Sequence, residues 1–115
     1  TANTLENTSK QVYGKYKTIN VNVKTINKFL PNSNTLIKLD VEGAEYNILK
    51  SINFSKKYNR KIFFEVNNNI SSKQIFNLIK LKNLKCFSEL NVWKKVKYLS
   101  QMPSSWKHGS VLIDK

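Results

Sequence analysis

The sequence L-I-K-L-D-V-E-G-A-E-Y-N-I-L-K, from Leu36 to Lys50, decides how we expect the chain to fold. Its first six residues are mostly apolar, as in a buried strand covered on both faces. Gly43 permits the positive φ that a sharp turn out of the strand requires. Apolar side chains then recur at helical spacing, at Ala44, Ile48, Leu49 and Ile52. The stretch predicts a strand, a tight acidic turn and a helix.

The turn carries three of the seven acidic residues of the chain: Asp40, Glu42 and Glu45. Period-two alternation predicts that Asp40 and Glu42 share one side of the strand end. In open α/β sheets, ligands bind outside the carboxyl ends of the strands. Three interpretations follow: acids at a helix N-terminus, ligands of a hard cation, or a site facing a substrate or cofactor. The spacing matches no calcium loop, which disfavours the cation, and Glu45 is expected to stabilise the helix.

Hydrophobic periodicity predicts the other elements of the chain. The polar residues 1–16 are expected to form a loop or disordered lead-in, and residues 17–115 a single domain. Alternating strands and helices favour an α/β layer with right-handed crossovers and a mostly parallel sheet. Residues 92–99 fit a helix or a strand equally well. The expected strands are 17–24, 36–41, 62–66, 85–90 and 110–114, and the expected helices are 25–30, 44–52 and one starting at Ser71 or Ser72.

Four pieces of the sequence resemble the FkbM-type methyltransferases. K-L-D-V-E-G-A-E-Y-N-I-L-K, from Lys38 to Lys50, is similar to the central signature of that family. Upstream, V-K-T-I-N-K-F-L (residues 23–30) resembles a short helix that precedes the signature, with Asn27 and Lys28 in place of acids. Downstream, K-I-F-F-E-V (residues 61–66) resembles the next strand, which ends in a glutamate, here Glu65. G-S-V-L-I-D (residues 109–114) resembles the last strand.

The resemblance implies an S-adenosylmethionine-dependent enzyme with a partial Rossmann-like class I methyltransferase sheet and flanking helices. Such enzymes methylate a hydroxyl group of a sugar or another small molecule. Asp40 and Glu42 are implied as catalytic residues, because a nearby carboxylate can accept the proton of the hydroxyl. Gly43, Glu65 and His108 are implied to face the substrate. For Glu65 the alternative is an ion pair with a lysine, and for His108 a plain surface position.

The resemblance also implies that the chain is the carboxy-terminal part of a longer domain. No G-x-G motif precedes Asp40, so the glycine-rich cofactor loop is expected outside this chain. The chain alone is therefore expected to be inactive. Strand 36–41 is expected to lack its neighbour and to present an open edge through which chains can associate.

Composition gives a rival interpretation. The net charge is +13, and a basic module that binds polyanions such as nucleic acid is the alternative function. Arg60 is the one arginine among 20 basic residues, whereas nucleic-acid readers favour arginine, so a solvated lysine-rich surface is preferred. No apolar run is long enough to cross a membrane. The single cysteine, Cys86, is expected to be buried filler and is consistent with a reducing, cytoplasmic location.

Overall fold

The computed structural model describes residues 14–54 and 57–115. The expected lead-in, residues 1–16, falls almost entirely outside the described residues. The described elements are the strands β1 (Thr35–Leu39), β2 (Arg60–Glu65), β3 (Lys85–Ser88) and β4 (Ser110–Asp114), the helices α1 (Glu45–Ser51) and α2 (Asn69–Leu81), and the single 3-10 turns η1 (Ile26–Lys28), η2 (Leu99–Gln101) and η3 (Trp106–His108).

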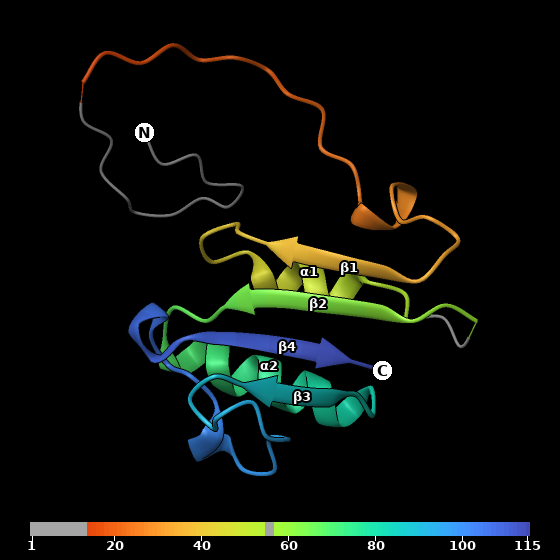
Figure 1. Ribbon diagram of the computed structural model, residues 1–115. Helices are drawn as coiled ribbons and strands as arrows, with labels where there is room; N and C mark the ends of the chain where they lie inside the picture. Colours follow the sequence, from red (N-terminus) through yellow and green to blue (C-terminus); the bar gives the residue numbers. More distant parts are fainter. Residues whose placement is uncertain (1–13, 55–56) are drawn as a thin grey trace.

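The four strands form one mixed sheet in the order β1-β2-β4-β3 (Figure 1). β1 and β2 are parallel, whereas β4 is antiparallel to both of its neighbours. The expectation of a mostly parallel sheet was therefore wrong. The crossovers through α1 and α2 do leave β1, β2 and β3 pointing the same way. β4 inserts between β2 and β3 in the opposite direction, so just one of the three ladders is parallel.

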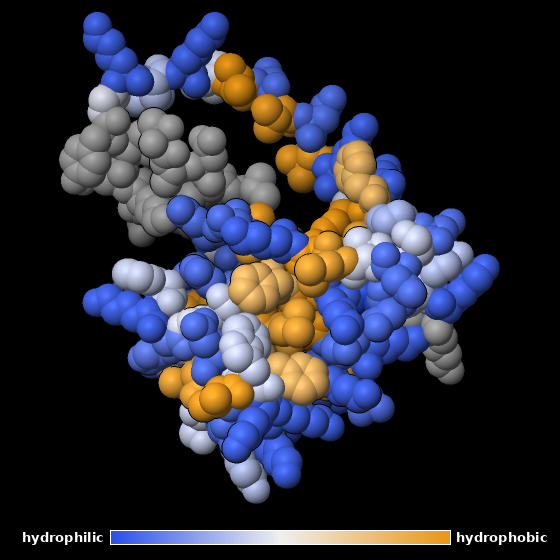
Figure 2. All heavy atoms as spheres, viewed as in Figure 1, coloured by the Kyte–Doolittle hydropathy of each residue, from blue (hydrophilic) through white to orange (hydrophobic). Residues whose placement is uncertain are grey.

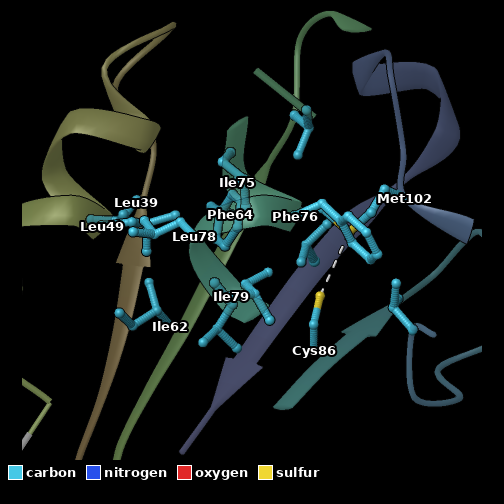
Figure 3. Close-up of a cluster of buried hydrophobic side chains, with 14 of the residues drawn as sticks. Leu39, Leu49, Ile62, Phe64, Ile75, Phe76, Leu78, Ile79, Cys86 and Met102 are labelled. Atoms are coloured by element: carbon cyan, nitrogen blue, oxygen red, sulfur yellow. Dashed lines mark hydrogen bonds between the residues drawn. The ribbon is translucent and has the colours of Figure 1, made fainter. Parts of the chain in front are cut away.

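Both helices lie on the same face of the sheet (Figure 1). Strand residues on that face form two rows, which are buried except for the half-buried Ile37, and side chains from both helices pack against them (Figure 3). In α2 an apolar stripe is buried against the sheet. The first row is Ile37, Ile62, Ile113 and Cys86, the second is Leu39, Phe64, Val111 and Ser88, and the stripe is Ile75, Phe76, Leu78 and Ile79.

The ends of the central elements differ slightly from the prediction. β1 ends at Leu39 rather than residue 41, because the turn begins there. α2 begins two residues before Ser71, because Asn68 is its N-cap. The side-chain Oδ1 of Asn68 accepts the backbone N–H of Ser71 at 2.8 Å. A side-chain acceptor of this kind satisfies one of the N–H groups that a helix start leaves unpaired.

Residues 17–24 do not form the predicted strand. They have no regular structure, and Ile19, Val21 and Val23 are 69%, 69% and 82% exposed. In Figure 1 this segment arches away from the sheet. Alternating apolar residues form a stable strand only beside a partner strand, and no other described segment pairs with these residues. The predicted helix 25–30 is reduced to the single turn η1.

Residues 92–99 form neither the predicted helix nor the predicted strand. Val92 and Trp93 have positive φ values of 54° and 57°, which interrupt both patterns. A single bridge then pairs Lys95 with Phe87 of β3. Trp93 is thereby turned back over the sheet, where its ring stacks on Phe63 with centroids 6.2 Å apart.

The face of the sheet opposite the helices carries a continuous row of five side chains. The cross-strand partners in this row are Lys38, Phe63, Leu112, Phe87 and Lys95. Figure 2 views this face and shows apolar residues in its centre, with hydrophilic residues around them. The three apolar members of the row are half-buried and the two lysines are exposed.

Arg60, the one arginine, is buried inside the fold. It is 7% exposed, and its guanidinium donates to the backbone carbonyls of Asn53 and Pro31. It connects the loop before β1 and the loop after α1 to the start of β2. This arginine therefore anchors loops and is not part of the basic surface.

Candidate functional site

The carboxyl ends of β1 and β2 open into a cavity of about 620 Å³, which we call the acidic crevice. The turn after β1, the end of β2, the connection to α2 and η3 all contribute to its wall. It is lined by Leu39, Asp40, Glu42, Gly43, Glu45, Glu65, Asn67, Asn68 and Trp106. The structure thus brings four of the five predicted site residues together: Asp40, Glu42, Gly43 and Glu65.

Backbone geometry gives the turn its shape. Glu42 and Gly43 both have positive φ, at 46° and 108°. A Cβ added at Gly43 would meet no atom within 4 Å, so the turn requires glycine for its conformation and not for space. Because β1 has already ended, strand alternation does not extend to Glu42. The predicted pairing of Asp40 and Glu42 on one side of a strand was wrong, and the turn itself brings both side chains to the crevice.

Glu45 stabilises the conformation of this turn. Its side chain is 5% exposed, and its Oε2 accepts the backbone N–H of Gly43 at 2.9 Å. The carboxylate lies in the first turn of α1, where it also interacts favourably with the positive end of the helix dipole. This contact agrees with the expectation that Glu45 stabilises the helix start.

The β2 side of the crevice is polar as well. Glu65 is the last residue of β2 and is exposed. Among the described residues it forms no ion pair with a lysine. Asn67 and Asn68 follow it and line the same wall, and Asn68 also caps α2. The two asparagines were missed as site residues, although their position after a strand end was a usable signal.

Trp106 was also missed. It comes from η3, far along the chain, and is 62% exposed beside the crevice. The connection between β3 and β4 has no periodic pattern that would predict this position. His108, two residues further on, does not line the crevice. It lines a second cavity on the other side of η3, together with the start of α2.

The charge of the crevice is opposite to that of the chain. Four carboxylates line it and no lysine, arginine or histidine does, although the net charge of the chain is +13. Such a lining attracts cations and accepts hydrogen bonds from hydroxyl groups. Within residues 14–54 and 57–115, no group of three or more His, Cys, Asp or Glu side chains is placed to hold a metal ion.

In open α/β sheets, ligands bind outside the carboxyl ends of the strands, and the acidic side chains of this chain lie at that edge. The sequence model of the methyltransferase FkbM domain matches residues 1–94, and the chain belongs to this family. The matched range holds β1, β2, β3 and the acidic turn, whereas η3 and β4 lie beyond it. No curated protein and no solved structure matches the chain. None of the helices in the described residues is long and apolar enough to cross a membrane.

Methyltransferases generally use S-adenosylmethionine, which supplies an electrophilic methyl group on a positively charged sulfur. The crevice fits the cationic and hydroxyl-bearing parts of this molecule, because Asp40, Glu42 and Glu65 offer carboxylate oxygens. It does not fit the anionic carboxylate of the molecule, because no basic side chain lines it. The three glycines of the sequence, Gly14, Gly43 and Gly109, are far apart and form no glycine-rich loop. The residues present can therefore hold one part of the cofactor.

Proposed function

We propose that the chain forms the acceptor side of an S-adenosylmethionine-dependent methyltransferase that acts on a hydroxyl group of a sugar or another small molecule. One observation carries the proposal: Asp40, Glu42 and Glu65 gather at the carboxyl ends of β1 and β2 in a crevice without basic side chains. Family membership supports methyl transfer, and the composition of the crevice supports an acceptor rich in hydrogen-bond donors.

Methyl transfer to oxygen is an in-line displacement, so the main task of the protein is to position the acceptor hydroxyl. In the proposed mechanism, the carboxylate of Asp40 or Glu42 would accept the hydroxyl proton as the oxygen–carbon bond forms and the bond between sulfur and the methyl group breaks. The cofactor would supply the methyl group and leave as a neutral thioether. Glu65 and Asn67 accept and donate hydrogen bonds at other hydroxyls of the acceptor. Gly43 and Glu45 keep the turn in the conformation that presents Asp40 and Glu42.

We further propose that residues outside this chain supply the grip on the anionic end of the cofactor. The absence of a G-x-G motif from the 115 residues supports this, as does the lack of any cation in the crevice lining. On this basis the chain alone binds the cofactor weakly and is inactive. We also propose a cytoplasmic location, which the buried free thiol of Cys86 supports.

Isothermal titration with S-adenosylhomocysteine tests the proposal on this chain and on the chain extended by any residues that its gene encodes upstream. We expect binding in the extended form, with Asp40→Asn and Glu42→Gln lowering its methyl transfer to sugars by at least about 100-fold. Asp114→Asn is the matched control, because Asp114 pairs with Lys61 at 3.8 Å and lies outside the crevice. Absence of binding in both forms would refute the proposal.

The basic-module alternative has one structural observation in its favour. The uncovered row on the sheet places Phe63 and Phe87 between two exposed lysines, Lys38 and Lys95, with Trp93 stacked on Phe63. Aromatic side chains flanked by lysines bind single-stranded nucleic acid by stacking and charge neutralisation.

Titration with a fluorescent single-stranded oligonucleotide at several salt concentrations distinguishes this candidate. If the row binds nucleic acid, Lys38→Met and Lys95→Met should each reduce the slope of log K against log salt by roughly 0.7. Asp40→Asn should leave the slope of log K against log salt unchanged. Equal slopes in all variants would exclude the row as a nucleic-acid site.

A further inference from the structure

The second cavity lies beside the acidic crevice and has the opposite charge. Its volume is about 420 Å³, and it lies between the start of α2, η2 and η3. No carboxylate lines it, whereas one lysine, one histidine and three serine hydroxyls do. The polar residues that matter here are Ser72, Lys73, Ser100, Ser104 and His108. We call this cavity the basic hollow.

Hydrogen bonding orients the histidine in the hollow. The backbone N of Ser104 lies 3.4 Å from Nδ1 of His108, and the Oγ of Ser104 lies 3.5 Å from the same atom. When Nδ1 accepts the backbone N–H, the neutral ring carries its own proton on Nε2. Nε2 is then a hydrogen-bond donor.

Lys73 adds the second donor. It is exposed on α2 and forms no hydrogen bond or ion pair among the described residues. Its ammonium group is thus available to a ligand in the hollow. Three serine hydroxyls complete a set that is rich in donors and contains no anion, which is the chemistry that binds phosphate, sulfate or carboxylate groups.

The hollow and the crevice share two walls. Asn68 lines the crevice and the next residue, Asn69, lines the hollow. In η3, Trp106 lines the crevice and His108 the hollow, and two residues of a 3-10 helix advance by only about 4 Å along the axis. The two cavities are therefore neighbours, separated by η3 and the start of α2.

We propose that the basic hollow binds an anionic group of the methyl acceptor, so that the acceptor is an acidic small molecule, with a hydroxyl group in the crevice and a phosphate, sulfate or carboxylate in the hollow. This inference rests on the proposed function, because the term acceptor assumes methyl transfer. It also gives His108 a role as a substrate-facing residue outside the crevice.

The test is a titration of the chain with inorganic phosphate and with sulfate, followed by nuclear magnetic resonance of the backbone amides and the imidazole. We expect dissociation constants on the order of 1–10 mM, with the signals of Ser72, Ser104 and His108 moving most. Lys73→Met combined with His108→Gln should weaken binding about tenfold. Lys80→Met, on the same helix, is the control, because its Nζ lies 4.5 Å from the Phe76 ring centroid and outside the hollow.

Weak shifts spread over all lysine-bearing surfaces, unchanged in the double variant, would overturn the anion site. The test needs neither cofactor nor turnover, so its failure is distinguishable from a failure of methyl transfer. S-adenosylhomocysteine binding by the extended chain without phosphate binding would refute the hollow alone. Phosphate binding without S-adenosylhomocysteine binding would uphold the hollow and refute methyl transfer. A 6-phosphate sugar that binds more tightly than both phosphate and the neutral sugar would support one ligand spanning both cavities.

Discussion

Lys82 should make a measurable contribution to stability, because it joins the two helices behind the sheet. It is the C-cap residue of α2, and its Nζ donates to three backbone carbonyls at the end of α1. The distances are 2.9 Å to Lys50, 3.1 Å to Ile52 and 3.4 Å to Leu49. Carbonyls at a helix C-terminus lack partners within the helix and carry partial negative charge, so a cation there is favourable.

The size of the effect follows from two opposing contributions. Hydrogen bonds with a charged donor contribute about 1.5–3 kcal/mol each when well formed, and two of the three distances are short enough. Burial lowers the pKa of Lys82, because the covered ammonium group is less well hydrated. Solvent screening reduces the gain further, because the side chain is half-buried. We expect Lys82→Met to lower the free energy of unfolding by about 1–2 kcal/mol and the melting temperature by roughly 4–10 °C.

The assay is urea denaturation followed by circular dichroism, together with a thermal melt. Methionine keeps most of the apolar stem of lysine, so the change reports the ammonium group. Lys73→Met is the matched control, since it removes the same charge from the same helix at a position without a contact in the described structure. Equal stability losses in the two variants, or none in Lys82→Met, would refute the capping role.

Four more outcomes follow from the fold. Gly43→Ala should cost about 1–2 kcal/mol, because residue 43 has a φ of 108°, whereas Gly14→Ala, in the segment away from the sheet, should leave the urea midpoint unchanged. Burial raises the pKa of Cys86 to about 12. Its reaction with a thiol reagent at pH 8 should therefore be roughly 1,000-fold slower than that of an ordinary thiol of pKa 9.0. Fast labelling would contradict the burial of this thiol. Because of the raised pKa, the folded state binds more protons than the unfolded state above pH 9.0. The free energy of unfolding of the protein should therefore fall by up to about 1.4 kcal/mol per pH unit from pH 9.0 towards pH 12. The Cys86→Ala variant should lack this slope. Leu36→Lys at the open edge of β1 should reduce concentration-dependent association in sedimentation experiments, whereas the control Leu81→Lys, at a position that is also exposed, should not. An equal reduction in both variants would exclude the edge as the site of association.

Hydrophobic periodicity predicted the elements whose partners lie within the described residues. Strand 110–114 was predicted with the bounds that β4 has. Alternation carries no information on strand direction, so it could not reveal that β4 runs antiparallel between β2 and β3. It also could not show that the pattern in 17–24 lacks a partner strand, because pairing is a property of the whole sheet.

The acidic turn was predictable because strand, glycine and helix signals coincide there. Asp40, Glu42, Gly43 and Glu65 do line one crevice. Trp106 could not be predicted, because η3 is placed by the long connection from β3 and by no local pattern. The separation of His108 from the crevice has the same origin, since one 3-10 turn sends Trp106 and His108 to opposite sides.

Under the proposed function, the open edge of β1 and the lack of basic side chains in the acidic crevice have one physical cause. β1 pairs with β2 alone among the described residues, and its carboxyl end leads directly to Asp40. A parallel strand added to this edge would end beside the acidic crevice, where its following turn can supply the missing donors for the anionic end of the cofactor. The same strand would cover the backbone groups that make the edge prone to association. In the extended chain, S-adenosylhomocysteine binding and the loss of association through Leu36 should therefore appear together. Cofactor binding with edge association retained would mean that the missing donors reach the crevice by another route than the β1 edge.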